Sequence, residues 1–306
     1  MTQSPPYAAD NVKLAIFAVI SMALSLSLGD ALIKKISSDF PLWQMFVIRS
    51  AIAVPVLIAI IRIRGRSRSL IPTHIGWTAL RSLLLALMWV AYYAALPHVP
   101  LPTAAAVYYT LPLFVTLFAA FFLGEKAGIQ GWVAICIGFC GVLLIVRPQA
   151  GAINVYALLP LISAILFAFA ILLTRTKCRG ESPLVLSLSV NVSFIVVGFV
   201  ATLFTPYLRP LVGDVSSYSF LLGEWISMGS SEWLAMSLLA VAIILGSTFA
   251  AIAYQNGPAS TVATFDFTYL PFAACWGFLF FAEIPDTIAI IGIFMIAGAG
   301  ILAVRR

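Results

Sequence analysis

The chain of 306 residues is 62% hydrophobic and only 9% charged, with a mean hydropathy of +1.09. Too few polar side chains exist to coat a soluble globule of this size, so the composition predicts a polytopic membrane protein. The formal net charge of +6 does not indicate nucleic-acid binding, because the arginines gather beside apolar segments rather than in a folded basic domain.

Apolar segments follow one another along the whole chain, and each is close to the 20 or so residues that a helix needs to cross a bilayer. We therefore predict an all-α integral membrane protein with ten transmembrane helices. In chain order, the predicted spans are 14–33, 41–61, 77–96, 103–123, 130–146, 155–173, 183–204, 233–254, 259–281 and 287–304. No small-residue cleavage site follows the first span, which we interpret as an uncleaved anchor.

Cationic residues are divided unevenly between the two sides of these spans. One set of alternate segments holds Lys13, Arg62, Arg64, Arg66, Arg68, Lys126, Arg175, Lys177, Arg179, Arg305 and Arg306. The other set holds only Lys34, Lys35, Arg147 and Arg209. The positive-inside rule assigns the richer set to the cytoplasm, so both termini are predicted to be cytoplasmic, in a cell (inner) membrane.

The two halves of the chain share a series of markers that indicate an internal repeat. The matching pairs are Asn11-Val12 with Asn154-Val155, Pro41-Leu42 with Pro183-Leu184, Trp77 with Trp233, Pro102 with Pro258, and Glu125 with Glu283. These pairs predict two five-helix repeats, 11–148 and 152–304. Since five is odd, the second repeat crosses the membrane in the opposite sense, and inverted repeats are typical of secondary transporters.

Small residues form a stripe on one face of the fifth predicted span and again on the tenth. The aligned positions are Gly131, Ala134, Gly138 and Gly141 in the first half, and Ala289, Gly292, Ile296 and Ala299 in the second. Small side chains let helix backbones approach closely in lipid, so both stripes predict helix contacts.

Two opposite charges lie deep in the predicted spans. At 1.5 Å per helical residue, Arg49 is about 12 Å into span two and Asp266 about 12 Å into span nine, within the run 257–272. A charge near the bilayer centre costs roughly 2.5 to 3.5 kcal/mol, so it usually faces a polar cavity or a partner. In one interpretation Arg49 binds a substrate carboxylate or phosphate and Asp266 takes up and releases a coupling proton; in the other they form a fixed ion pair. Repeat alignment places Asn191 at the Arg49 position, as a further candidate for substrate binding.

Two more charged residues lie nearer to the ends of their spans. Asp30 is about 24 Å along span one and one turn before Lys34, which favours a solvated pair between them; the alternative is an outer gate or a second proton-coupling site. Arg81 is one turn inside span three on the cytoplasmic side, where its long side chain can extend to the membrane surface.

Aromatic residues gather in spans three, four and nine, where they are candidates to line a binding cavity. Those with the best placement are Trp89, Tyr93, Tyr108 and Phe267. Rings with hydroxyl and indole groups suit an amphipathic or planar solute, although helix packing is the alternative role. Pro112 and Pro271 each remove a helical hydrogen bond near this region, which leaves a carbonyl free or kinks the helix.

Several short sequence motifs occur in similar form in both halves of the chain and resemble those of a known protein family. Pro112-Leu113-Phe114 and Leu270-Pro271-Phe272, the closing pairs Gly124-Glu125 and Ala282-Glu283, and the glycine-bearing helix after each are similar to the two copies of the EamA-type repeat of the drug/metabolite transporter superfamily. The resemblance covers nearly the whole chain and departs from the family at Ala282, where glycine is usual. It implies a ten-helix carrier for small metabolites, commonly an exporter of amino acids or related compounds, with some relatives taking up vitamins or nucleoside-like cofactors.

The favoured function is therefore secondary active transport by alternating access, with export of an amino acid or related solute and proton coupling through Asp266 and Asp30. Alternatives are an uptake carrier for a vitamin or nucleoside-like cofactor, and a non-transporting membrane sensor or assembly subunit. An enzyme is not expected, because no nucleophile with a base lies at depth, and no phosphate-binding loop indicates ATP drive. The expected partners are a small-molecule substrate, membrane lipid and protons, with no nucleic acid, in a monomer or homodimer. Neither a cofactor nor a metal is expected, since the four cysteines lack zinc-ligand spacing.

Overall fold

A computed structural model of the protein describes residues 11–36, 40–64, 69–123, 129–146, 155–211, 219–257, 262, 265–266, 268–284 and 286–304, and all regular structure in these ranges is helical. The elements are α1 (Val12–Ile36), α2 (Leu42–Arg64), α3 (Ile75–Ala95), α4 (Leu101–Tyr108), α5 (Leu111–Leu123), α6 (Ile129–Val146), the 3-10 helix η1 (Val155–Leu158), α7 (Leu159–Thr176), α8 (Pro183–Leu208), the 3-10 helix η2 (Arg209–Leu211), α9 (Ser219–Leu222), α10 (Ser230–Asn256), α12 (Tyr269–Phe281) and α13 (Thr287–Val304).

Helices long and apolar enough to cross a membrane dominate this part of the chain. Six qualify by length and composition: Val12–Ile36, Leu42–Ile63, Ile75–Ala95, Tyr156–Thr176, Pro183–Leu208 and Ser230–Asn256. Shorter apolar helices, among them Tyr269–Phe281 and Ile290–Ala299, add to them. Large apolar side chains such as Phe17, Phe121 and Phe294 are 62%, 72% and 73% exposed, as suits a surface covered by lipid rather than water. The predicted all-α, multi-pass membrane architecture is confirmed.

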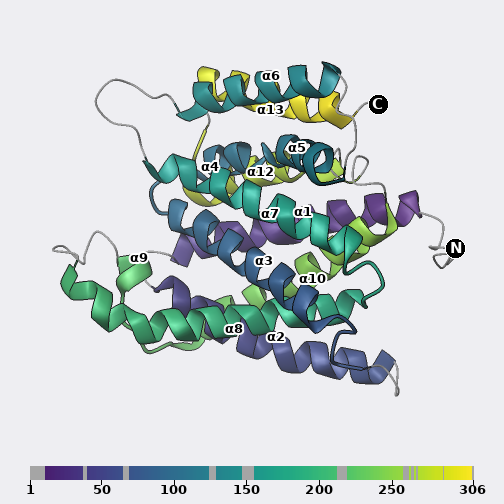
Figure 1. Ribbon diagram of the computed structural model, residues 1–306. Helices are drawn as coiled ribbons and strands as arrows, with labels where there is room; N and C mark the ends of the chain where they lie inside the picture. The colour runs from purple at the N-terminus through teal and green to yellow at the C-terminus, as the bar shows by residue number, and fades with distance from the viewer. Residues whose placement is uncertain are drawn as a thin grey trace, which may run out of the picture.

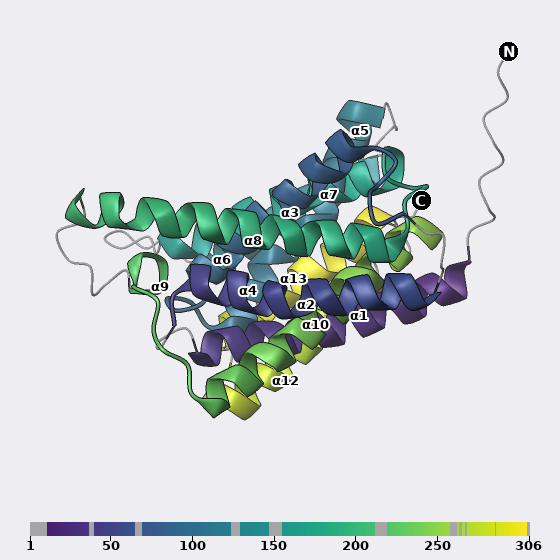
Figure 2. The ribbon, with the colours of Figure 1, turned by 90° about the horizontal axis from the view of Figure 1, so that it is seen from below.

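Long helices pack in pairs through most of their length. α1 lies along α10, α3 along α7, α2 along α8, and α6 along α13. Figure 1 shows α6 and α13 together at one edge of the bundle and α2 and α8 at the opposite edge, with α4, α5 and α12 beneath the first pair. The view from below in Figure 2 shows α8, α2 and α10 crossing the bundle in front of the other helices. The centre of the bundle therefore lies among α1, α3, α4, α7, α10 and α12.

The predicted fourth and ninth spans are not single helices. α4 ends at Tyr108 and α5 begins at Leu111, and the Thr110 hydroxyl donates to the Val107 carbonyl at 2.8 Å across the break. α12 begins at Tyr269, and the Thr268 hydroxyl likewise donates to the Phe265 carbonyl at 2.8 Å. A proline follows closely in each case, and it has no N–H group to continue the helical ladder. The prolines thus mark helix starts inside both spans.

Close backbone contact between α6 and α13 accounts for part of the predicted small-residue stripes. A Cβ added at Gly141 would lie 2.9 Å from the Gly292 carbonyl oxygen and 2.9 Å from Cγ1 of Ile296. A Cβ added at Gly138 would lie 3.4 Å from Cβ of Ala299. The bulkier Ile296 is accommodated because glycine stands opposite it. The predicted role of these positions in helix contact is confirmed.

Ala282 explains why glycine suits the end of α12. Among the described non-glycine residues, Ala282 alone has a positive φ, of 53°. This is the left-handed region, where a Cβ costs roughly 1 to 2 kcal/mol. The N–H groups of Ala282 and Glu283 donate to the Phe278 and Gly277 carbonyls at 3.0 and 3.1 Å. This turn ends the helix and directs Glu283 back toward the bundle.

Candidate functional site

An internal cavity lies between the two broken spans and helices α1, α3 and α7. Its lining is mainly aromatic and includes two carboxylates. The lining residues are Met22, Leu26, Asp30, Trp89, Tyr92, Tyr108, Tyr109, Phe167, Asp266 and Tyr269. We call it the carboxylate cavity. Of the predicted site residues, it brings together Asp30, Trp89, Tyr108 and Asp266.

Asp266 is 1% exposed and is held by two phenol groups. Tyr109, at the break between α4 and α5, donates its hydroxyl to Oδ1 at 2.9 Å. Tyr254, near the end of α10, donates to Oδ2 at 3.1 Å. No ion pair joins Asp266 to Arg49, although both side chains belong to the described part of the chain. The alternative of a fixed pair between these two residues is wrong.

Asp30 is also 1% exposed, and its surroundings repeat those of Asp266. Tyr93 on α3 donates its hydroxyl to Oδ1 at 3.1 Å, and Tyr269 on α12 donates to Oδ2. The expected solvated pair between Asp30 and Lys34 is wrong: α3 and α12 cover this face of α1, and the ion pair of Lys34 is formed with Glu283. Asp30 therefore belongs with Asp266 in the interior.

Arg49 lies behind the cavity rather than in its wall. Its guanidinium carbon is 4.7 Å from the ring centre of Phe46, 4.5 Å from that of Phe194 and 5.6 Å from that of Tyr93. Nε and Nη2 are buried without a hydrogen-bond partner. Tyr93 therefore contacts Arg49 through its ring and Asp30 through its hydroxyl.

The other predicted residues are distributed as follows. Tyr93 stacks on Trp89 with ring centres 4.8 Å apart, so it supports the cavity wall from behind. Asn191 is fully buried on α8, donates Nδ2 to the Ser187 carbonyl at 3.0 Å, and does not line the carboxylate cavity. Phe267 lies outside the described residues. Among the residues that the structure describes, no group of three potential metal ligands comes together.

The sequence and the fold have counterparts among known proteins. The EamA-like transporter family is matched by residues 13–147. A riboflavin transporter of Rhizobium johnstonii is 30% identical over 236 residues, which are 76% of this chain and 72% of that protein. The chain belongs to the EamA-like transporter family.

Other relatives of this EamA-like transporter carry different names. The pseudopaline exporter CntI of Pseudomonas aeruginosa is 28% identical over 287 residues, 92% of this chain and 93% of that protein. An S-adenosylmethionine uptake transporter of Rickettsia bellii is 27% identical over 215 residues, 68% of this chain and 65% of that protein. One solved crystal structure shares the fold with a TM-score of 0.64 at 20% identity, over 96% of this chain and 98% of the other. The protein is thus a small-molecule transporter and not an enzyme.

Three tyrosines that donate to the buried carboxylates of this EamA-like transporter were not among the predicted site residues. Tyr109, Tyr254 and Tyr269 each donate to a buried carboxylate, and the Tyr92 and Tyr269 hydroxyl oxygens are 3.3 Å apart. The available signal was the presence of phenol groups deep within apolar spans, where a buried hydroxyl needs a hydrogen-bond partner.

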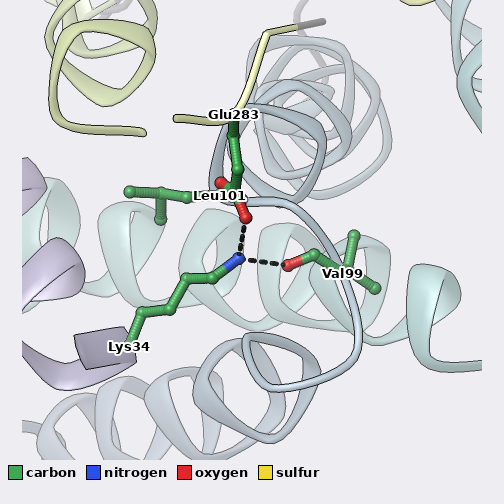
Figure 3. Close-up of polar contacts among 4 residues, drawn as sticks. All are labelled: Lys34, Val99, Leu101 and Glu283. Atoms are coloured by element: carbon green, nitrogen blue, oxygen red, sulfur yellow. Dashed lines mark hydrogen bonds and ion pairs between the residues drawn. The ribbon is translucent and has the colours of Figure 1, made fainter. Parts of the chain in front are cut away.

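One end of the bundle carries an ion pair between α1 and the residue pair that follows α12 (Figure 3). Nζ of Lys34 is 2.6 Å from Oε1 of Glu283 and donates to the Val99 carbonyl at 3.0 Å. Glu283 also accepts the N–H of Leu101, the first residue of α4, at 3.0 Å through Oε2. The lysine and glutamate side chains are only 13% and 21% exposed, so water screens the pair weakly. Lys34 and Glu283 therefore tie α1, α4 and α12 together.

The opposite end has its own carboxylate tie. Glu181, between α7 and α8, is 7% exposed and accepts the N–H groups of Thr73 and His74 at 3.1 and 2.8 Å. Gln255 at the end of α10 donates to the carbonyls of Cys178 and Glu181 at 3.2 and 2.8 Å. Glu181 and Gln255 therefore join the start of α3, the α7–α8 connection and the end of α10.

Reversing the charge of Lys34 is expected to weaken the tie among α1, α4 and α12. In Lys34→Glu two carboxylates face each other, and the loss of a charged hydrogen bond costs about 1.5 to 3 kcal/mol. Flux of a transported solute in proteoliposomes should fall several-fold. The swapped double variant K34E/E283K should recover most of the flux, because it restores opposite charges. Equal loss in the single and double variants would show that the tie does not take part in the transport cycle.

Proposed function

We propose that this protein is an alternating-access secondary carrier that exports an amino acid or a related small polar or amphipathic solute and couples export to protons through Asp266 and Asp30. In this proposal it works in the inner membrane with both termini in the cytoplasm, as the distribution of cations favours. The transporter family supplies the general activity, and the proposal adds mechanism, direction and coupling.

Alternating access requires two related halves, and we propose that residues 11–148 and 152–304 form inverted five-helix repeats. The packing pattern supports this proposal. If α1, α2, α3, α5 and α6 correspond to α7, α8, α10, α12 and α13, then the contact of α1 with α10 corresponds to that of α3 with α7. The contact of α1 with α12 likewise corresponds to that of α5 with α7, and α2 with α8 and α6 with α13 each correspond to themselves. An exchange of halves would preserve this pattern, as a two-fold pseudosymmetric carrier requires.

The observation that carries proton coupling is the pair of buried carboxylates in one cavity. Asp30 and Asp266 receive hydrogen bonds from tyrosines, which are neutral, and neither is in an ion pair with a described residue. An isolated charge in an apolar interior is costly, so such a carboxylate takes a proton or a cation as its surroundings change. A side chain that is alternately buried and hydrated during transport would exchange its proton once per cycle.

The aromatic lining favours a solute with an apolar or planar part, because rings supply contact area while hydroxyls supply direction. Export is favoured by the pseudopaline exporter, which matches almost from end to end. Uptake of a riboflavin-like vitamin is the second candidate, supported by the riboflavin transporters among the relatives and by the same aromatic lining.

A flux screen in proteoliposomes tests the proposal directly. The full chain is reconstituted and offered labelled amino acids, riboflavin and nucleoside derivatives, with and without an imposed pH gradient. We expect at least one solute to move faster than through protein-free vesicles, and its rate to respond to the gradient. Flux that ignores the gradient would remove proton coupling but keep the carrier. Stable binding of a partner protein with no flux of any solute would favour the sensor or assembly subunit instead.

A further inference from the structure

A second cavity lies beside the carboxylate cavity and contains a buried arginine. It shares Leu26, Trp89 and Phe167 with the first cavity. Tyr254 also lines it, and the hydroxyl of that residue donates to Asp266 in the first. The two cavities therefore adjoin at one aromatic wall. We call the second one the arginine cavity.

Arg81 enters this cavity from the first half of α3. The sequence favoured a side chain that extends to the membrane surface, but Arg81 is only 4% exposed because α7 covers it. Its Nε donates to Oγ1 of Thr174 at 2.5 Å, and Thr174 in turn donates to the Ala170 carbonyl at 2.7 Å. The threonine thus holds Nε of the guanidinium group, and this hydrogen bond does not involve the two terminal nitrogens.

The remaining edge of the guanidinium group has unused donors. Nη1 of Arg81 is buried without a hydrogen-bond partner. The residues that line the arginine cavity include no carboxylate, and no ion pair joins Arg81 to any acidic residue in the described ranges. Burial raises the pKa of the nearby Cys178 thiol, so that group stays protonated at neutral pH and supplies no negative charge.

A buried, positively charged fork with free donors is costly unless an anion completes it. Planar guanidinium groups match the two oxygens of a carboxylate or phosphate. We propose that the arginine cavity binds a carboxylate or phosphate group of the transported solute through Arg81, with Thr174 as the positioning residue and Trp89 and Phe167 covering the apolar part. This proposal rests on the proposed carrier function and adds that the solute is anionic at one end.

The test compares probe pairs that differ only in the anionic group. Phenylalanine and phenylalanine amide report a carboxylate, and riboflavin 5′-phosphate and riboflavin report a phosphate. Binding to the full chain in lipid nanodiscs is measured by titration calorimetry, which needs no flux. We expect the wild type to prefer the member with the carboxylate or phosphate in at least one pair. Arg81→Gln should weaken binding of that member at least tenfold, while binding of the member without that group changes little.

Matched variants separate binding from folding. Arg175→Gln makes the same change one residue from Thr174, on a partly exposed side chain, and should keep the preference. Arg81→Lys retains the charge and should keep part of it. Thr174→Val removes the hydrogen bond to the guanidinium group but keeps Arg81. The same binding preference is measured in this variant in case Arg81→Gln unfolds. No preference in the wild type for any pair, or equal weakening of both members in the folded Arg81 and Thr174 variants, would overturn the proposal. Flux of a neutral solute alongside such a result would leave the carrier function standing.

Discussion

Asp266→Asn is expected to abolish flux driven by a pH gradient, with a fall of at least tenfold, while exchange of labelled for unlabelled solute continues. Asparagine keeps the shape of the side chain and can still accept the hydrogen bond of Tyr109 or Tyr254, so the cavity wall is preserved. It cannot bind or release a proton between pH 5 and 8. Net proton-driven transport therefore stops, and exchange, which requires no net proton movement, persists. Both rates are measured in proteoliposomes with the same labelled solute.

Glu232→Gln is the matched control for Asp266→Asn. It removes another carboxylate by the same chemical change, at a partly exposed position in the first turn of α10. Its gradient-driven flux should equal that of the wild type. If Asp266→Asn retains undiminished flux that still follows the gradient, Asp266 has no part in coupling, although the carrier itself would remain.

Local sequence signals were sufficient for the long helices but not for the broken ones. Runs of about 20 apolar residues predicted α1, α2, α3, α7, α8 and α10 within a few residues, because length and hydropathy are properties of the segment itself. Pro112 and Pro271 indicated that the fourth and ninth spans lose a hydrogen bond, but both breaks lie just before the proline, where Thr110 and Thr268 satisfy a carbonyl. Whether a proline bends or interrupts a helix depends on such neighbouring groups.

The clearest signal for the site was a charge that contradicted its surroundings, with the aromatic residues Trp89 and Tyr108 as a second signal. Asp266 stood out because it interrupts an apolar run, and the structure places it in a buried cavity. Residue position along the helix predicts that Asp30 and Arg81 lie at the membrane boundary, but position alone does not include the neighbours that cover a helix end. The packing of α3 on α7 buries Arg81, and that contact joins segments some 90 residues apart. No local pattern encodes this pairing.

The carboxylates are connected through the tyrosines, which suggests a single coupling unit. Tyr109, which donates to Asp266, and Tyr269, which donates to Asp30, have ring centres 5.3 Å apart. Protonation of one carboxylate weakens the acceptor to which its tyrosine donates, and the tyrosine beside it donates to the other carboxylate. Groups that act as a unit give non-additive losses, since removing either member already disables the unit.

Asp30→Asn is accordingly expected to reduce gradient-driven flux at least tenfold, and the double variant D30N/D266N to be no slower than either single variant. Asparagine still accepts a hydrogen bond from Tyr93 or Tyr269, so the thermal unfolding midpoint should change little. Asp30→Ala instead leaves both hydroxyls without their acceptor, at about 1 to 3 kcal/mol each, and should lower that midpoint clearly. If Asp30→Asn transports normally while Asp30→Ala unfolds early, Asp30 only joins α1 to α3 and α12. A different outcome is that both single variants are impaired and the flux of the double variant falls by the product of the two effects. The carboxylates would then act independently, as two separate proton sites.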